Sequence, residues 1–199
     1  MRVALTDYGV GNLHSIRKSL EENGARVDIV RDMGRLLDAE CIVFPGVGAF
    51  DKTIEMLLPF RSEVRDHVLS GTPALGICIG EQIMFESSSE GTSPGLGIFP
   101  GEVRRLSLRM IPHMGWNSVE TNDPIMDGIS DRDFYFAHSY HSVTKDPSHS
   151  IGTTTCEDVT FSSLFRTANA YGAQFHPEKS GASGLRFIKN FIDFAEGCL

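Results

Sequence analysis

Cys78 lies midway in the run Gly76-Ile77-Cys78-Ile79-Gly80, which has the glycine-x-nucleophile-x-glycine form of a nucleophile elbow. In such an elbow the reactive side chain stands on a tight turn from a strand into a helix, and larger residues do not fit at the two flanking positions. A cysteine after an apolar run is otherwise most often a small buried residue. Because a core strand does not need two flanking glycines, the spacing favours a nucleophile.

A base and a carboxylate follow far downstream, in the run Phe175-His176-Pro177-Glu178. On an extended strand, residues two apart point to the same face, so Glu178 would lie beside the His176 ring and hold its tautomer. His176 would take the thiol proton and later protonate the leaving group. His-Pro-Glu alone is more often a surface turn. Combined with the elbow, it predicts a catalytic triad of Cys78, His176 and Glu178.

The elbow would also activate and assist the nucleophile. It places Cys78 at the start of a helix, whose positive end favours the thiolate. The backbone N–H of Ile79 would be one donor of an oxyanion hole. A second donor, Val47 or Gly48, would come from the turn at residues 45–48, whose glycines would let a peptide rotate. The alternative interpretation of that turn is a plain strand ending.

The bulk composition describes one ordinary globular domain, residues 1–199, with a hydrophobic share of 41%. A net charge of −8 argues against a nucleic-acid binder, and no apolar stretch is long enough for a membrane helix. The first loop, residues 7–12, lacks the third glycine of a dinucleotide motif and the lysine of a P-loop. We therefore expect neither a nucleotide site nor a membrane or nucleic-acid partner.

The cysteines show neither metal-ligand spacing nor a disulfide framework; they are Cys41, Cys78, Cys156 and Cys198. This usage fits a reduced, cytoplasmic setting, and the N-terminal apolar run is too short for a signal peptide. We expect no metal and no cofactor.

The apolar pattern of the first half alternates between strands and helices, which predicts an open α/β fold with a mostly parallel sheet flanked by helices. The expected strands are 3–6, 27–30, 41–44 and 74–77, and the expected helices are 13–20, 51–69 with a break near Pro59, and 79–85. Between residues 95 and 175 short strands and turns predict an antiparallel extension, which includes 171–175. A last helix, 184–195, would have Ser183 as its N-cap.

These motifs resemble the class I, or triad, glutamine amidotransferases, and within them the glutaminase subunits of imidazole glycerol phosphate synthase. The triad runs are shared across the class, whereas the run Pro-His-Met-Gly-Trp-Asn at 112–117 is specific to the subgroup. The matching runs lie in order along the whole chain, at residues 7–13, 45–50, 112–117, 135–140 and 174–180. His141 stands where the subgroup more often has Tyr or Arg.

The resemblance implies hydrolysis of L-glutamine to glutamate and ammonia through a thioester on Cys78. It also implies a heterodimer with a (β/α)8-barrel cyclase subunit, which would use the ammonia to make imidazole glycerol phosphate and an aminoimidazole carboxamide ribotide in histidine biosynthesis. The implied glutamine-binding residues are Gln82, Glu90, Ser139 and Tyr140. The implied partner-contacting residues are Asn12, His113, Met114, Trp116, Tyr135 and Lys179.

Two alternatives remain open from the sequence. The chain could be a glutaminase that serves another synthase, which the run at 112–117 argues against. It could also be a non-catalytic binding module with a buried cysteine on the same fold, which the intact pair of His176 and Glu178 argues against.

Overall fold

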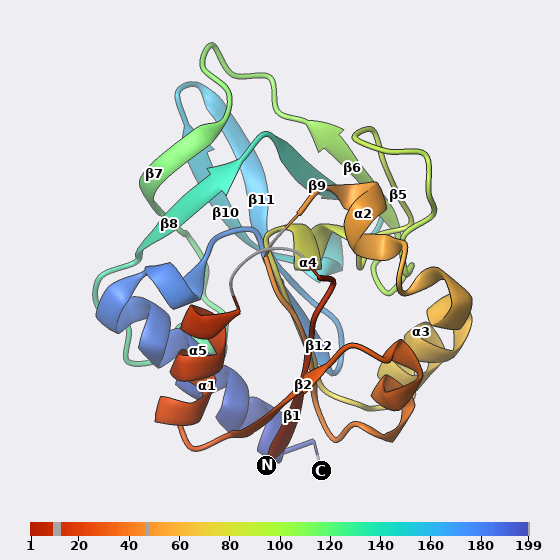
Figure 1. The fold of residues 1–199 in the computed structure, drawn as a ribbon. Helices are drawn as coiled ribbons and strands as arrows, with labels where there is room; N and C mark the ends of the chain where they lie inside the picture. The colour runs from red at the N-terminus through yellow and green to blue at the C-terminus, as the bar shows by residue number, and fades with distance from the viewer. Residues whose placement is uncertain (10–12, 47, 199) are drawn as a thin grey trace.

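The computed structural model describes residues 1–9, 13–46 and 48–198. Among them, seven strands form a central sheet in the order β10-β11-β12-β4-β3-β1-β2 (Figure 1). The strands from β12 to β2 are parallel, and β10 and β11 add an antiparallel edge. Their bounds are β1 Arg2–Thr6, β2 Arg26–Val30, β3 Ile42–Phe44, β4 Ala74–Ile77, β10 Ser150–Cys156, β11 Val159–Arg166 and β12 Ala170–Ala173.

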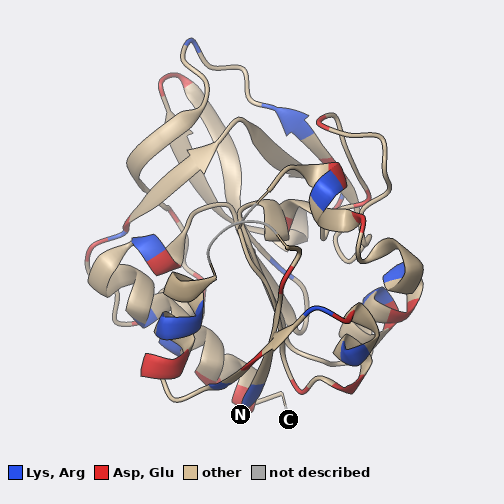
Figure 2. Ribbon diagram, in the orientation of Figure 1, with Lys and Arg blue, Asp and Glu red and all other residues tan. Residues whose placement is uncertain are grey.

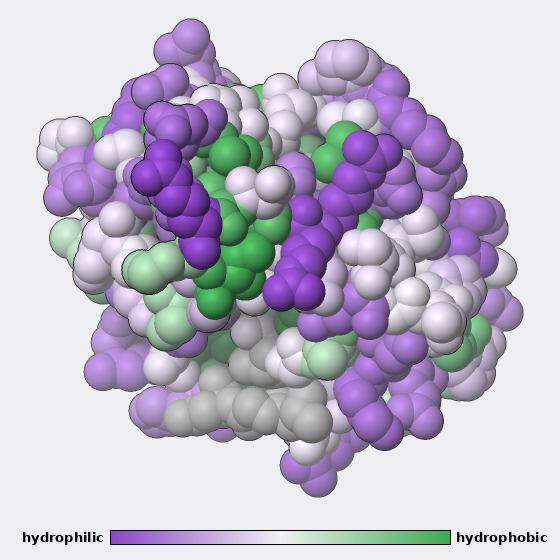
Figure 3. Space-filling model, turned by 90° about the horizontal axis from the view of Figure 1, so that it is seen from above, coloured by the Kyte–Doolittle hydropathy of each residue, from purple (hydrophilic) through white to green (hydrophobic). Residues whose placement is uncertain are grey.

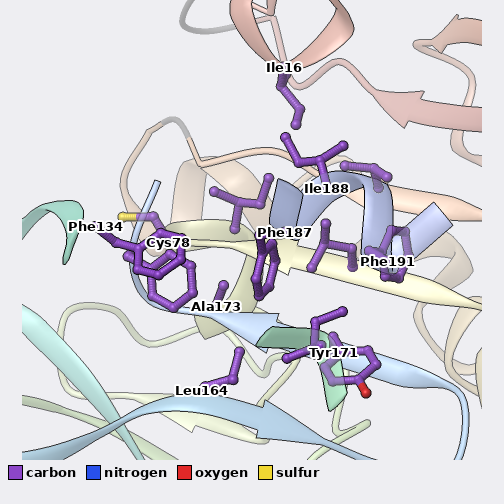
Figure 4. Packing of buried hydrophobic residues seen from close by; sticks show 14 of the residues in the cluster. Ile16, Cys78, Phe134, Leu164, Tyr171, Ala173, Phe187, Ile188 and Phe191 are labelled. Atoms are coloured by element: carbon purple, nitrogen blue, oxygen red, sulfur yellow. The ribbon is translucent and has the colours of Figure 1, made fainter. Parts of the chain in front are cut away.

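Helices cover both faces of this sheet, each over its own hydrophobic cluster, because parallel strands must be buried on both sides. Helices α1 (His14–Glu22) and α5 (Gly181–Glu196) cover one face, and Figure 4 shows Ile16 of α1 above Ile188 of α5. The other face carries η1 Met33–Asp38, α2 Phe50–Ile54, η2 Leu58–Phe60 and α3 Arg61–Leu69.

Two small sheets lie beyond the carboxyl ends of the central strands, at the top of Figure 1. One contains β5 (Ser87–Ser88), β6 (Gly101–Arg105) and β9 (Tyr140–Thr144). The other is the antiparallel pair β7 (His113–Ser118) and β8 (Asp133–His138). The remaining short helices are α4 Ile79–Gln82, η3 Pro124–Met126, η4 Pro147–His149 and η5 Pro177–Lys179.

Strand β8 is fastened to the chain around His176. The N–H of His176 donates to the Tyr135 carbonyl at 2.8 Å, and the N–H of Tyr135 donates to the Ser180 hydroxyl at 3.0 Å. Phe134 of the same strand packs on Phe175 with ring centroids 4.3 Å apart. These contacts bring the small β7–β8 sheet next to the end of β12.

The predicted fold class is confirmed, and three local predictions are wrong. The strand expected at 171–175 belongs to the parallel core as β12, which pairs with β4. Helix α4 ends at Gln82 because the following carbonyls, those of residues 83–85, accept hydrogen bonds from residues 96–99. Helix α5 begins at Gly181, so Ser183 is no N-cap, and its hydroxyl donates to the Asp131 carbonyl instead.

Charged residues gather on the helices and outer loops, whereas β7 and β8 carry almost none along their length (Figure 2). In the part of the chain that the structure describes, no helix combines the length and apolar character needed to cross a bilayer.

Candidate active site

Cys78 stands on the turn between β4 and α4 in a strained backbone conformation, with φ 49° and ψ −112°. A positive φ is uncommon for a residue with a side chain, and it is maintained only where the surrounding structure enforces it. Here the Cys78 N–H donates to the carbonyl of Ala173 on β12 at 2.7 Å. The strand–turn–helix geometry expected of a nucleophile elbow is present.

The two glycines that flank the nucleophile are required by close approach. A Cβ at Gly80 would lie 2.0 Å from the carbonyl oxygen of Phe44, at the end of β3. A Cβ at Gly76 would lie 2.7 Å from the backbone nitrogen of Glu81. Backbone atoms cannot give way easily, so both positions exclude any larger residue, as the sequence spacing predicted.

His176 and Glu178 make the contact that a triad needs, with Nδ1 of the ring 2.8 Å from Oε1 of the carboxylate. The reason is not strand alternation, because Pro177 begins the short helix η5 and this turn brings Glu178 back under the ring. The His176 ring and Cys78 both lie against Gly46, where a Cβ would be 2.9 Å from His176 Cε1 and 3.0 Å from Cys78 Cβ.

The protonation of His176 reflects its partners. Burial lowers the pKa of His176. The charges of Cys78 and Glu178, together with the hydrogen bonds to both side chains, outweigh burial and raise the pKa to about 10. These partners favour the protonated ring where it faces the sulfur. An imidazolium beside a thiolate is the arrangement that makes a cysteine a strong nucleophile.

Two further groups contact the sulfur. Nε2 of the fully buried Gln174 lies 3.7 Å from Cys78 Sγ, and the carbonyl oxygen of Ala137 lies 3.9 Å from it. Neither residue, nor Gly46, was among the predicted site residues. The sequence signal that could have found Gln174 is its place in the matching run 174–180, two residues before His176.

A cavity of about 190 Å³ opens beside the nucleophile. All four predicted glutamine-binding residues line it, together with two of the predicted oxyanion-hole residues, Gly48 and Ile79. Its lining residues are Gly48, Cys78, Ile79, Gln82, Glu90, Pro112, Ala137, His138, Ser139 and Tyr140.

The structure describes two of the three predicted oxyanion-hole residues, Ile79 and Gly48. Ile79 is the first residue of α4, so its N–H belongs to the helix end where amides have no intrahelical acceptor. Gly48 has φ +105°, a conformation that favours glycine. Val47, the other predicted donor of that turn, lies outside the described residues.

Two of the glutamine-binding candidates are themselves anchored. Gln82 donates both amide N–H groups within the chain, to the Tyr140 carbonyl at 3.0 Å and to Oε1 of Gln174 at 2.9 Å. Oε2 of Glu90 accepts from the N–H of Phe50 at 3.0 Å. The cavity walls are thus held by hydrogen bonds to β9, to Gln174 just after β12, and to α2.

Four of the predicted partner residues form a surface beside the triad. Met114 and Trp116 on β7 are 63% and 57% exposed. The Trp116 and Tyr135 rings lie 6.2 Å apart, and Nζ of the exposed Lys179 lies 6.0 Å from the Tyr135 ring centre. Figure 3 shows this end of the molecule, where apolar residues gather between hydrophilic ones.

The other two predicted partner residues differ from this group. His113 is buried, with 7% of its surface exposed, and its ring hydrogen-bonds to His138 inside the chain. Asn12 lies outside the described residues.

Comparisons with known proteins agree with the geometry. A model of the family described as glutamine amidotransferase class-I matches residues 4–194. The imidazole glycerol phosphate synthase subunit HisH of Synechococcus sp. (strain JA-3-3Ab) is 44% identical over 204 residues, covering 98% of this chain and 94% of that protein. HisH of Halobacterium salinarum (strain ATCC 700922 / JCM 11081 / NRC-1) is 42% identical, covering 96% and 93%.

Solved structures show the same fold at lower identity. A crystal structure of a glutamine amidotransferase has a TM-score of 0.74 at 17% identity and covers 98% of both chains. A chain of PurLQS from Thermotoga maritima has a TM-score of 0.69 at 19% identity, and the match covers 97% of the present protein and 98% of that chain. The full-length matches confirm the resemblance read from the motifs: this chain belongs to the class I glutamine amidotransferases and, within them, to the HisH family of imidazole glycerol phosphate synthase subunits.

Proposed function

We propose that this glutamine amidotransferase hydrolyses L-glutamine through a thioester on Cys78 and supplies the ammonia to a cyclase subunit of imidazole glycerol phosphate synthase. The observation that carries the proposal is the strained elbow, which holds Cys78 between His176 and the mouth of the cavity. Its role in histidine biosynthesis accords with the HisH relatives.

The reaction follows from the site geometry. The Cys78 thiolate attacks the side-chain amide carbon of glutamine, and the imidazolium of His176 gives its proton to the leaving nitrogen, which departs as ammonia. Water then attacks the thioester, with His176 as the base, and glutamate leaves as the thiolate is restored. Glu178 holds the ring through Nδ1 in both steps.

Stabilisation of the oxyanion is assigned to backbone donors. The Ile79 N–H lies at the start of α4, where the helix dipole favours negative charge. We assign the second donor to the 45–48 turn, through Val47 or Gly48. Removing one donor of this kind costs about 10²–10³ in rate, so both donors matter for turnover.

The partner surface is Met114, Trp116, Tyr135 and Lys179. Exposed aromatic side chains and methionine beside a cation are typical of interface centres. We propose that a (β/α)8-barrel cyclase docks here to form a heterodimer, and we place the pair in the cytoplasm. The cysteines, all within described segments, are free thiols, which suits a reducing compartment.

Two measurements test the proposal. A glutamine-mimicking electrophile should add one covalent group to Cys78, detected by peptide mass spectrometry. Ammonia release from glutamine should be measured with the chain alone and with the cyclase present. Labelling without any ammonia release in either mixture would indicate a binding module, and stimulation only by another synthase would indicate a different partner.

A further inference from the structure

A hydrogen-bonded row of side chains crosses the β7–β8 sheet and ends at the glutamine cavity. Nδ2 of Asn117 lies 3.2 Å from Nε2 of His113, whose Nδ1 lies 3.0 Å from Nε2 of His138. Nδ1 of His138 lies 2.7 Å from the carbonyl oxygen of Tyr140. We call these contacts the histidine row.

The outer end of the row sets the direction of its hydrogen bonds. Oδ1 of Asn117 accepts from the N–H of Ser118 at 2.8 Å, and Nδ2 donates to the Thr155 carbonyl at 3.0 Å. The orientation of the amide is thereby fixed, and its second N–H faces Nε2 of His113. That ring nitrogen must accept, so the proton of a neutral His113 ring is on Nδ1.

The inner end requires the same direction independently. The carbonyl of Tyr140 can only accept, so Nδ1 of His138 carries a proton. A neutral His138 ring then has Nε2 free to accept from Nδ1 of His113. Both ends give the same arrangement, in which each neutral ring holds its proton on Nδ1.

The surroundings keep both rings uncharged. His113 and His138 are 7% and 5% exposed, and Phe136 and Phe161 pack on them at centroid distances of 4.9 Å and 5.4 Å. Burial lowers the pKa of both, that of His138 to about 3. A second proton on His113 would place an N–H at Nε2 against the N–H of Asn117, and one on His138 would place an N–H at Nε2 against the N–H of His113.

The row ends on a group that the cavity shares. The Tyr140 carbonyl that accepts from His138 also accepts from Nε2 of Gln82 at 3.0 Å. Gln82 in turn donates to Gln174, whose Nε2 faces Cys78 Sγ. Displacement of this one carbonyl would therefore move Tyr140 and Gln82, which both line the substrate cavity.

We propose that His113 and His138 are positioning residues for the glutamine site, which hold the Tyr140 carbonyl against Gln82 through neutral rings in the Nδ1–H tautomer. The inference rests on the proposed function, because it assigns the cavity to glutamine. It gives the buried His113 a role within this chain.

Ring ¹⁵N chemical shifts test the tautomers without reference to activity. In the folded full-length protein, labelled at its histidines and measured near pH 7.5, both rings should show a protonated Nδ1 and an unprotonated Nε2. The ring ¹⁵N signals are assigned by substitution: the His113 signals should be missing from His113→Asn, and the His138 signals should be missing from His138→Asn. A protonated Nε2 on either ring overturns the proposal.

Glutamine kinetics with the cyclase present test the positioning. His113→Phe keeps the ring but cannot donate to His138, and we expect KM for glutamine to rise about tenfold with a smaller change in kcat. His113→Asn places an N–H near the old Nδ1 and should restore KM to within about threefold of the parent. His141→Phe, on a ring that also packs against Phe161 but lies outside the row, is the control and should leave KM unchanged.

The outcomes separate the two proposals. A parent KM in His113→Phe, or an equal rise in the Phe and Asn variants, overturns the positioning role. If the parent itself hydrolyses no glutamine, the proposed function fails, and the ring shifts still decide whether the histidine row exists as described.

Discussion

The strained backbone at Cys78 has a chemical use. It holds the sulfur at the edge of the cavity and places Cys78 directly before the first residue of helix α4. Two neighbouring strands enforce it: Ala173 of β12 accepts from the Cys78 N–H, and the Phe44 carbonyl at the end of β3 leaves no room for a side chain at Gly80. A local turn could not maintain this conformation alone. The nucleophile is thus positioned by the parallel sheet.

Cys78→Ser should remove glutamine-dependent synthesis by the complex with the cyclase. Cys78 and Glu178 raise the pKa of His176, and a serine hydroxyl is too weakly acidic to form an ion pair with the charged ring. Synthesis from added ammonium salt bypasses the triad and should match the parent. Both rates are measured as product formed per minute, and glutaminase activity near the parent level would exclude Cys78 as the nucleophile.

Spacing in the sequence was enough to predict the elbow turn and the contact of His176 with Glu178, because each lies within a few residues of chain. It was not enough for β7, β9 and β11, which were not predicted. Strand β11 is held by antiparallel pairing to β10 and β12, and the two-residue turn before it has Glu157 at φ 52° rather than a turn-forming glycine. These segments are strands because of pairing with distant parts of the chain, which the local residue pattern does not show.

The same limit applies to the site. Gln174, which directly follows β12, and Ala137 of β8 reach the sulfur from segments far apart in the sequence. Contacts of this kind depend on the register between strands, which no short motif encodes. The contact of His176 with Glu178 was predicted correctly from the wrong geometry, because Pro177 turns the chain into η5.

Gly48→Ala should restrict the 45–48 turn. Its φ of +105° lies in a region that L side chains rarely adopt, so alanine there is strained in the present conformation. If this turn supplies an oxyanion donor only when the cyclase is bound, the glutaminase rate with the cyclase should fall about 10-fold or more, while the rate of the chain alone changes little. Equal proportional loss of both rates would show that the turn is a fixed part of the site.

Glu81 on α4 should make the stability of the fold depend on pH. It is fully buried, and burial raises its pKa from 4.5 to about 8. Between these values the folded protein keeps the proton and the unfolded chain has released it, so stability from this group falls as pH rises. Each pKa unit corresponds to about 1.4 kcal/mol, so the total effect is at most a few kcal/mol.

Urea unfolding of Glu81→Gln tests this at several pH values. The variant should exceed the parent in unfolding free energy at pH 8, and the difference should shrink towards pH 5. Glu86→Gln is the matched control of opposite sign, because a hydrogen bond from Lys145 lowers the pKa of Glu86 and so stabilises the fold at higher pH. A constant difference between Glu81→Gln and the parent across this range would mean that Glu81 is charged in the folded protein.

The small β7–β8 sheet and the central sheet should unfold together as one domain, residues 1–199. Phe134 and Phe136 of β8 belong to the same buried cluster as Phe187 and Ile188 of α5. Trp116, the single tryptophan, lies on β7, whereas far-UV circular dichroism reports on all elements. The two signals should give coincident urea transitions, and an earlier tryptophan transition would show that this sheet is a separate unit.

Stimulation of the glutaminase in the complex should depend on Lys179, because this residue connects the partner surface to the triad. It directly follows Glu178, and its Nζ lies over Tyr135, whose carbonyl binds the N–H of His176. Lys179→Ala should therefore lower the stimulation of glutaminase by the cyclase about fivefold or more, while the far-UV spectrum and the urea midpoint stay at parent values. The control is Lys189→Ala, which removes a partly exposed lysine that pairs with Asp193 on α5. Stimulation in Lys179→Ala equal to that in the control would identify Lys179 as a solvated surface residue with no part in coupling.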